Sequence, residues 1–245
     1  DGTLKYWPDA DWHGSDSFTY QMCNSLNICG TATVTVTVNP LNDAPAVGDD
    51  VAVTLKDTPT TFSVAGNDFD IDLDSLYFAN ARSAAHGTPA ITADGQLTYT
   101  PKSGHTGQDD FTYDVCDKGA DGVAGNADDT CTAGTVYIAI NAAIFGNPTA
   151  VDDTDTTGED AAKETQVLSN DTVGAGASIY HVSDPQFGAA TSNNDKITYT
   201  PDNNSTASDT FDYLVCNAAD ACDMATVSIT VTAVNDAPVA MDDLA

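Results

Sequence analysis

The chain has 245 residues, enough for two complete small domains with their own cores. Its 37 acidic residues against 7 basic ones give a net charge of −30, which argues against nucleic acid and anionic membranes as partners. All of the acidic residues except Glu159 and Glu164 are aspartates, which suit turns and are hard oxygen ligands for Ca²⁺. The sequence contains no apolar run of about 18 residues, so we expect no membrane insertion by this segment.

A short motif that contains proline occurs three times, at residues 41–45 (LNDAP), 146–148 (GNP) and 234–238 (VNDAP). Each copy follows a run of alternating residues, the pattern of a half-buried β-strand, and precedes a pair of aspartates. Proline fixes φ and removes a backbone donor, so the motif predicts a joint at which one β-domain ends and the next begins.

Two further motifs give the length of the repeat. A Tyr-x-Pro motif precedes a Phe-x-Tyr motif in each copy, and the phenylalanines are Phe18, Phe111 and Phe211. A period of about 100 residues is typical of one β-sandwich rather than of a short solenoid repeat. Residues 1–45 should form the C-terminal half of a sandwich, with three strands of which the first spans 2–7. We predict complete sandwiches at 46–148 and 149–238, and the first strand of another repeat at 239–245.

The six cysteines fall into three close pairs, and the first of each pair lies three residues after the tyrosine that the repeats share. No C-x-x-C motif occurs and no histidine is near a pair, so the spacing favours disulfides over a metal site or free thiols. Local disulfides indicate an oxidising, extracellular setting. The predicted pairs are Cys23 with Cys29, Cys116 with Cys131, and Cys216 with Cys222.

Residues 67–74 (NDFDIDLD) are the most acidic stretch of the chain. Carboxylates at every second position can surround one cation with several oxygens, whereas without a cation they would repel one another. A Ca²⁺ site is therefore favoured here over a solvated loop. Residues 117–129 combine aspartates with three glycines, which fits either a second ion loop, through Asp117, Asp121 and Asp128, or an ordinary Gly/Asp loop.

The order of motifs, G-x-L-x-Y-x-P, then G-x-D-x-F-x-Y, an alternating strand and V-N-D-A-P, resembles the tandem cadherin-like and immunoglobulin-like repeats of large bacterial surface proteins and adhesins. The resemblance covers essentially the whole chain and implies all-β, tandem immunoglobulin/cadherin-like β-sandwich domains in an elongated array. It also implies calcium at the joints. In cadherins the ions draw on the loop before the sixth strand, the linker, and the loop after the second strand of the next domain.

Carried onto this sequence, the resemblance gives three groups of candidate metal ligands. The first joint would use Asp16, Asn42, Asp43, Asp68, Asp70 and Asp72, the second Asp109 with Asn147 and Asp171, and a third half-site Asp209, Asn235 and Asp236. At the second joint Pro148 replaces the linker aspartate and the D-x-D motif is missing. We therefore expect the first joint to be rigid and filled with calcium. The second should bind fewer ions or none and be held by direct contacts, through Ile144 and Phe145.

No combination of residues suggests catalysis, because the histidines are scattered and the cysteines are paired, so we do not expect an enzyme. The leading hypothesis is a structural or adhesive protein at the extracellular surface, a calcium-stiffened rod or fibre whose partners are neighbouring repeats or copies arranged head to tail. The alternative is a homophilic or glycan-binding module. An exposed aromatic platform beside an ion would favour that alternative, and the candidate for it is Trp7. The ends of the chain fit either a fibre or a trimmed fragment.

Overall fold

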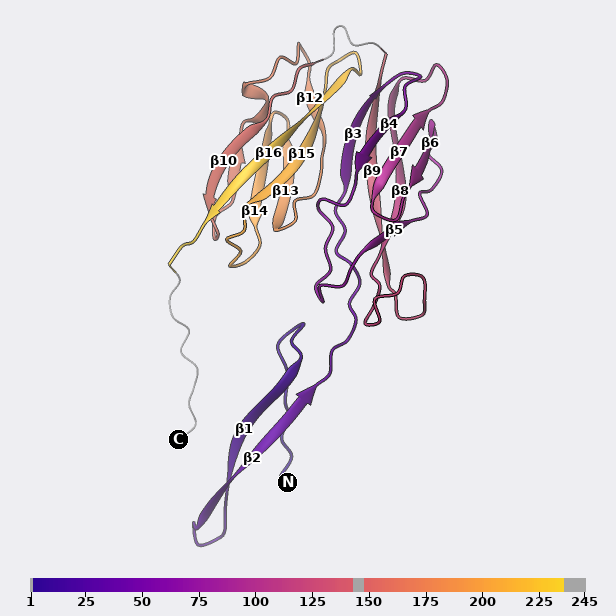
Figure 1. The fold of residues 1–245 in the computed structure, drawn as a ribbon. Coiled ribbons are helices and arrows are strands. Elements are labelled where there is room, and N and C mark those ends of the chain that lie inside the picture. Colours follow the sequence, from indigo (N-terminus) through magenta and orange to yellow (C-terminus); the bar gives the residue numbers. More distant parts are fainter. Residues whose placement is uncertain (1, 143–147, 236–245) are drawn as a thin grey trace.

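The structure is a computed structural model, and it describes residues 2–142 and 148–235. Within these residues the chain is almost entirely β, apart from a short 3₁₀ helix at Val167–Ser169 (Figure 1). The strands form one hairpin and two sandwiches. The hairpin consists of β1 (Gly14–Cys23) and β2 (Cys29–Val38).

The two sandwiches contain seven strands each, as the described residues show them. The first has β3 (Asp50–Leu55), β4 (Thr60–Ser63), β5 (Tyr77–Ala79), β6 (Gly87–Ile91), β7 (Gln96–Pro101), β8 (Gly107–Cys116) and β9 (Cys131–Asn141). The second has β10 (Asp153–Gly158), β11 (Lys163–Thr165), β12 (Ser178–Val182), β13 (Gly188–Asn193), β14 (Lys196–Pro201), β15 (Asp209–Cys216) and β16 (Cys222–Thr232).

Both sandwiches have the same topology. The first packs the sheet β3-β9-β8-β5 on the sheet β4-β7-β6, and the second packs β10-β16-β15-β12 on β11-β14-β13. In each, the first strand runs parallel to the last, with Asp50 opposite Val136 and Asp153 opposite Val227. The other strand pairings of the described residues are antiparallel, which is the immunoglobulin-like arrangement expected for these repeats.

Alternation along the strands builds the core between the two sheets of each sandwich. On β8 and β15 it turns Phe111 and Phe211 inward, and each is 3% exposed. Tyr99 stacks on Phe111 with ring centroids 5.6 Å apart, and Tyr199 stacks on Phe211 at 5.9 Å. The tyrosine of the first motif and the phenylalanine of the second therefore form a stacked pair of rings that is buried in each sandwich.

The hairpin differs from the prediction in one respect, because residues 2–7 are not a strand. The equivalent strands, β7 and β14, each pair with a neighbour on both sides. Among the described residues no such neighbours lie beside residues 2–7, so their backbone groups have no ladder to join. Tyr6 still stacks on Phe18, with ring centroids 6.3 Å apart.

The three predicted disulfides are confirmed, and together they contain all six cysteines. Each joins two strands at the end of an antiparallel pair, β1 to β2, β8 to β9, and β15 to β16. They therefore brace the same corner of all three repeats. No helix of the described residues is long and apolar enough to span a membrane.

The two sandwiches lie side by side, and the hairpin extends away from the end of the first (Figure 1). The outer faces of the β3–β9 pair and of the β12–β15–β16 sheet meet, and they bury Val51, Ala139 and Leu214 in a shared apolar cluster. The elongated part of the array is thus the hairpin followed by the first sandwich. The second sandwich returns alongside the first.

Candidate functional site: the two joints between repeats

The first joint, between the hairpin and the first sandwich, contains three carboxylates that converge. One oxygen each from Asp70, Asp72 and Asp74 lies within 4.8 Å of the others. The loop curls around Asp70, whose Oδ1 accepts hydrogen bonds from the backbone N–H groups of Asp72 at 2.9 Å and Asp74 at 3.4 Å. Leu73 takes a positive φ of 64°, which lets the chain turn so tightly. Alternate residues therefore point their carboxylates to one place.

The linker and a second acidic loop close around this cluster. The backbone N–H of Asp43 donates to Asp72 Oδ2 at 2.8 Å. The Asn42 side chain donates to Asp117 Oδ2 at 3.2 Å, and Thr130 donates through its hydroxyl to the Asp43 carbonyl oxygen at 3.2 Å. The two loops that the sequence suggested as separate ion sites are thus parts of one site, with the linker between them.

The electrostatics of this cluster favour a cation. Asp70 is 4% exposed, and its Oδ2 has no hydrogen-bond partner among the described residues. Burial raises the pKa of Asp70, and the charges of Asp74 and Asp117 raise it further against the two backbone hydrogen bonds. Burial and then the charges of Asp72, Asp117 and Asp128 raise the pKa of Asp74. The carboxylates therefore destabilise one another, and a bound cation would remove this repulsion.

Several predicted ligands lie elsewhere in the structure. Asp109 accepts the Tyr99 hydroxyl at 2.6 Å and the His86 backbone N–H at 2.8 Å. Asp209 is its equivalent in the second sandwich and accepts the hydroxyl of Tyr199. The carboxylates of these two aspartates accept hydrogen bonds from groups within their own sandwiches.

Asp16, Asp121 and Asp68 also have hydrogen-bond partners of their own. Asp16 accepts the Tyr6 hydroxyl at 2.9 Å, and Asp121 accepts the Asn126 side chain at 2.8 Å. Asp68 bonds to the Gly48 backbone N–H at 3.0 Å. Asn235 is exposed, and Asp236 and Asn147 are outside the described residues. Asp74 was not among the predicted ligands, although the alternation of aspartates continues to it.

At the second joint the described residues of the two sandwiches contact each other directly. The amide of Asn141, which is 2% exposed, donates to the Cys222 carbonyl at 2.7 Å and accepts from the Cys222 N–H at 2.8 Å. One side chain thus pairs with the backbone of β16 as a neighbouring strand would. Ile144 and Phe145, the residues expected to make the contact, lie outside the described residues.

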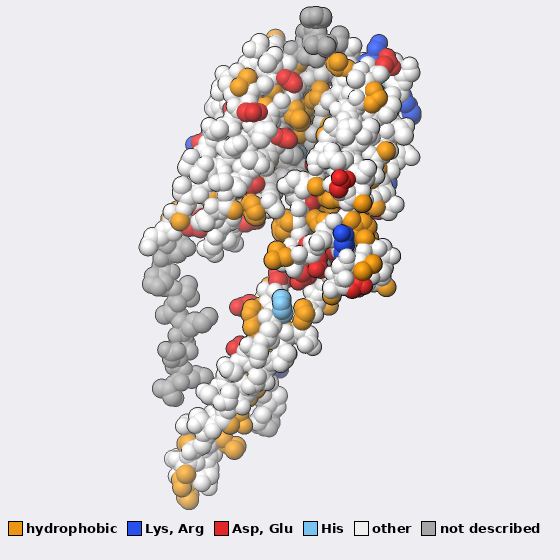
Figure 2. Space-filling view, viewed as in Figure 1, with side chains coloured by type: hydrophobic (Ala, Val, Ile, Leu, Met, Phe, Trp, Pro, Cys, Tyr) orange, Lys and Arg blue, Asp and Glu red, His pale blue; other side chains and the backbone are white. Residues whose placement is uncertain are grey.

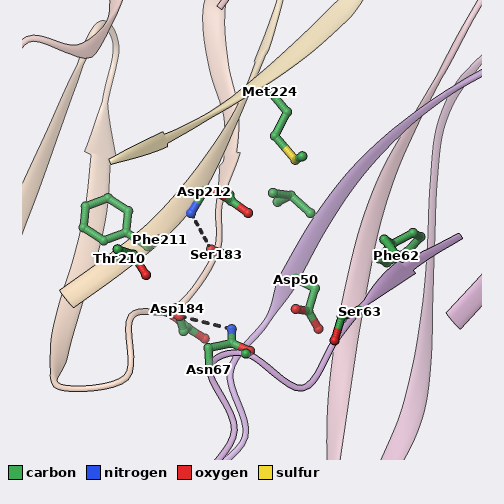
Figure 3. Close-up of a pocket in the computed structure, with 12 residues that line it drawn as sticks. Asp50, Phe62, Ser63, Asn67, Ser183, Asp184, Thr210, Phe211, Asp212 and Met224 are labelled. Carbon is green, nitrogen blue, oxygen red and sulfur yellow. Dashed lines mark hydrogen bonds between the residues drawn. The ribbon is translucent and has the colours of Figure 1, made fainter. Parts of the chain in front are cut away.

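The surfaces that meet border an open pocket of about 210 Å³. Figure 3 shows Asp50 and Asn67 of the first sandwich facing Asp184 and Asp212 of the second. Asn67 donates to the Asp184 carbonyl at 3.1 Å and to the Asp49 carbonyl at 3.0 Å. We call the contact surface between the two sandwiches, which includes Val51, Ala139 and Leu214, the seam. The hydrogen bond from Asn67 to Asp184 crosses it and helps to fix the relative position of the two sandwiches.

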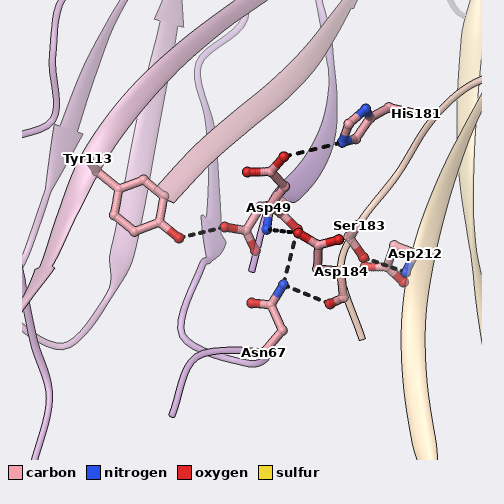
Figure 4. A network of polar contacts seen from close by, with 8 residues as sticks. Asp49, Asn67, Tyr113, His181, Ser183, Asp184 and Asp212 are labelled. Carbon is pink, nitrogen blue, oxygen red and sulfur yellow. Dashed lines mark hydrogen bonds and ion pairs between the residues drawn. The ribbon is translucent and has the colours of Figure 1, made fainter. Parts of the chain in front are cut away.

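A histidine lies in the same network (Figure 4). His181 stacks on Tyr137 with ring centroids 3.7 Å apart, and its Nε2 is 3.9 Å from Asp49 Oδ2. Burial lowers the pKa of His181, although the charges of Asp49 and Asp184 act in the opposite direction. These contacts join the two sandwiches through a ring stack and a pair of charged groups.

One family model, described as the bacterial Ig domain, matches residues 1–37, 42–133 and 146–230. These three stretches correspond to the hairpin and the two sandwiches. No curated protein matches the chain.

Solved structures that resemble the chain include cadherin ectodomains. Domains EC1–4 of Drosophila N-cadherin are 11% identical, with a TM-score of 0.43, and the match covers 93% of this chain and 61% of that one. Domains EC1–3 of mouse protocadherin-24 are 16% identical, with a TM-score of 0.38 and coverage of 91% and 81%. An endo-fucoidan hydrolase of glycoside hydrolase family 107 is 18% identical, with a TM-score of 0.29 and coverage of 96% and 38%. The chain spans 60% of the matched protocadherin gamma B2 fragment.

Proposed function

The chain belongs to the bacterial Ig domain family, and we propose that it is a structural or adhesive part of an extracellular protein, stiffened by calcium at its first joint. Immunoglobulin-like and cadherin-like repeats typically serve as spacers and adhesive modules outside the cell. We propose no catalytic role. The proposed partners are neighbouring repeats or further copies of the same chain, arranged head to tail.

The observation that carries the proposal is the convergence of Asp70, Asp72 and Asp74 beside the linker. Ca²⁺ prefers six to eight oxygen ligands, chiefly carboxylates and carbonyls, in a flexible arrangement. The buried Oδ2 of Asp70, which has no hydrogen-bond partner among the described residues, fits a ligand that the protein itself does not supply. Asp117 lies near enough for its charge to raise the pKa of Asp70 and Asp74, and the linker reaches the cluster through the backbone N–H of Asp43, which donates to Asp72.

A cation at this place would tie three segments of the chain together, namely the linker, the loop after β4 and the loop between β8 and β9. The linker would lose its freedom to bend, and the hairpin would be fixed against the first sandwich. The other predicted ligands, among them Asp16, Asp109 and Asp209, would bind an ion only after giving up the hydrogen bonds described above.

Calorimetric titration of Ca²⁺ into the 245-residue chain tests the proposal. We expect binding in the wild type and loss of most of the binding heat in Asp70→Asn, because the buried oxygen would no longer carry a charge. Asp160→Asn is the matched control, since Asp160 is an exposed aspartate outside the cluster. Equal heats from Asp70→Asn and from Asp160→Asn would rule out this calcium site.

A further inference from the structure

Each sandwich contains a tyrosine hydroxyl that lies among more acceptor oxygens than its one proton can serve. In the second sandwich four oxygens lie 3.0–3.5 Å from the Tyr213 hydroxyl, namely Asp171 Oδ2, Asp153 Oδ2 and the carbonyl oxygens of Val151 and Val167. A hydroxyl donates one hydrogen bond at a time, and O–H···O bonds are usually about 2.7–2.8 Å long. We call this hydroxyl and the oxygens around it the oxygen cage.

The first sandwich repeats the oxygen cage at equivalent positions. The Tyr113 hydroxyl lies 2.7 Å from Asp50 Oδ2 and 3.4 Å from the Val64 carbonyl oxygen. Figure 4 shows this hydroxyl directed at the carboxylate that it contacts. Tyr113 is on β8 and Asp50 begins β3, just as Tyr213 is on β15 and Asp153 begins β10. The cage is therefore a property of the repeat and is present in both complete copies.

The second carboxylate of the first cage has an oxygen without a partner. Asp68 Oδ1 accepts the Gly48 backbone N–H at 3.0 Å, just as Asp171 Oδ1 accepts that of Val151 at 2.8 Å. Because both carboxylates are anchored in the same way, Asp68 Oδ2 is directed toward its tyrosine as Asp171 Oδ2 is. Asp68 is 8% exposed, and its Oδ2 has no hydrogen-bond partner among the described residues. A buried acceptor of this kind indicates a ligand that the chain itself does not supply.

The cages also carry negative charge without a basic partner. Figure 2 shows acidic side chains spread over this face of both sandwiches, with few lysines and arginines among them. The lysine and arginine ion pairs of the described residues involve Asp114, Asp155 and Glu164, none of which belongs to a cage. Burial is the main reason that the pKa of Asp68 is raised to about 7 and that of Asp153 to about 6. A cation between the two carboxylates of a cage would supply the missing positive charge.

We propose that each oxygen cage binds one Ca²⁺ ion inside its sandwich, at a site separate from the acidic cluster of the first joint. Ca²⁺ takes carboxylate and carbonyl oxygens at about 2.3–2.6 Å, which places neighbouring ligands about 3–3.6 Å from one another. The 3.0–3.5 Å contacts of the Tyr213 hydroxyl match this spacing. Two carboxylates balance the charge of one divalent ion, whereas a single extra proton would leave most of the acceptors unmatched.

The ion would hold the two sheets of a sandwich together. In the first sandwich Asp50 and Tyr113 belong to the sheet β3-β9-β8-β5, whereas Asp68 lies in the loop that follows β4 of the other sheet. The inference does not depend on the proposed calcium joint, because the second cage lies in a sandwich without the D-x-D motif. Each cage offers two carboxylates where the joint offers three, so we expect it to fill at higher Ca²⁺ concentrations than the joint does.

Equilibrium dialysis of the 245-residue chain against millimolar Ca²⁺, followed by metal analysis, counts the bound ions. The starting variant is Asp70→Asn, which removes the proposed joint ion and should retain one ion in each cage. Adding Asp171→Asn should weaken binding at the second cage about tenfold or more, because one of its two charged ligands is lost. Adding Tyr213→Phe removes only a neutral ligand and should weaken binding less. Asp160→Asn, which changes an exposed aspartate of the same sandwich, should leave binding unchanged.

Urea unfolding distinguishes the loss of an ion from the loss of the fold. In chelator Asp171→Asn should be at least as stable as its parent, because one of two carboxylates that repel each other has been removed. Addition of Ca²⁺ should raise the unfolding midpoint of the parent and raise that of Asp171→Asn less. A variant whose fold was merely damaged would be less stable in chelator as well.

The outcomes also separate this inference from the calcium joint. Ca²⁺ binding by the wild type with no ion retained by Asp70→Asn would overturn the cages and leave the joint standing. Equal Ca²⁺ affinities after Asp171→Asn and after Asp160→Asn would overturn the second cage. Stabilisation by a lower pH alone, without any response to Ca²⁺, would mean that the carboxylates share a proton instead of an ion and would overturn the proposal.

Discussion

At the scale of single residues, each sandwich places two carboxylates, one buried and one half-buried, around one tyrosine. The hydroxyl of Tyr213 lies 3.3 Å from Asp153 Oδ2 and 3.0 Å from Asp171 Oδ2. This hydroxyl has one proton and can donate to only one of them at a time. In the first sandwich Tyr113 donates to Asp50 at 2.7 Å, while the Oδ2 of the equivalent Asp68 has no hydrogen-bond partner among the described residues. Both sandwiches therefore contain a carboxylate that is poorly compensated when ionised.

The first residue-scale prediction concerns pH. Burial and then the charge of Asp171 raise the pKa of Asp153 to about 6, although Tyr213 lowers it in part. An acid whose pKa is higher in the folded state stabilises the fold below its unfolded pKa, and this contribution is lost as the pH rises through the folded value. In the presence of chelator we expect the stability contributed by Asp153 to fall between about pH 4 and pH 6.

Replacement of the residue checks this assignment. Asp153→Asn keeps an acceptor for Tyr213 and cannot ionise, so its unfolding free energy should decline less over that pH range than that of the wild type. Urea titrations at several pH values measure the difference. Asp160→Asn, which changes an exposed carboxylate of the same sandwich, should keep the wild-type pH profile. A profile of Asp153→Asn that coincides with the wild type would contradict the raised pKa.

Residue types predicted the acidic site only in outline. Alternation placed Asp70 and Asp72 correctly on one side of their loop, and the same alternation extends to Asp74. Asp109 and Asp209 have the same chemistry and a position that cadherins use, yet each is occupied by a tyrosine hydroxyl. Which oxygen remains available depends on partners that are far away in sequence, and these are visible only in three dimensions.

At the scale of elements, the strands could be predicted well, because apolar alternation, turn residues and cysteine pairs all indicate the same strand positions. The hairpin shows the limit of that reasoning, since residues 2–7 have the pattern of β7 but join no sheet of the described residues. The seam shows another limit. Asn141 stands at the end of an apolar strand, and nothing local to it indicates that its amide pairs with Cys222, 81 residues away.

This pairing gives an element-scale prediction. Asn141→Ala leaves both the N–H and the C=O of Cys222 buried without their partners, so we expect a loss of about 1–3 kcal/mol in the free energy of unfolding. Chemical denaturation measures it, with Asn203→Ala, an exposed loop substitution, as the control. A wild-type midpoint for Asn141→Ala would mean that the seam does not depend on this amide.

At the scale of the molecule, the two joints differ in how they hold the chain. The first has a linker whose Asp43 N–H donates to one of three converging carboxylates. The second lies between surfaces that pack directly. The strand register shows why the first sandwich packs through its β3–β9 face. The outward pairs there are Val51–Tyr137 and Val53–Ala139. The equivalent pairs of the second sandwich carry hydroxyls, Thr154–Ser228 and Thr156–Thr230.

The hydroxyl-rich face of the second sandwich is exposed, whereas its apolar counterpart in the first sandwich is largely buried. Lateral packing is therefore specific to this pair of repeats and does not continue along the array through the equivalent face. The two described joints therefore hold the chain in different ways, the first through its acidic linker and the second through sandwiches that pack side by side.

The last prediction tests the folded-back arrangement. Ala139 is fully buried in the seam, and an aspartate there would carry an unpaired charge into the apolar cluster. We expect Ala139→Asp to separate the sandwiches, with a larger radius of gyration in small-angle X-ray scattering and an unchanged β-sheet signal in circular dichroism. Thr230→Asp makes the same change at the equivalent, exposed position of the second sandwich and should leave the scattering curve as it is. If Ala139→Asp and Thr230→Asp scatter alike, contacts other than the apolar seam hold the second sandwich beside the first.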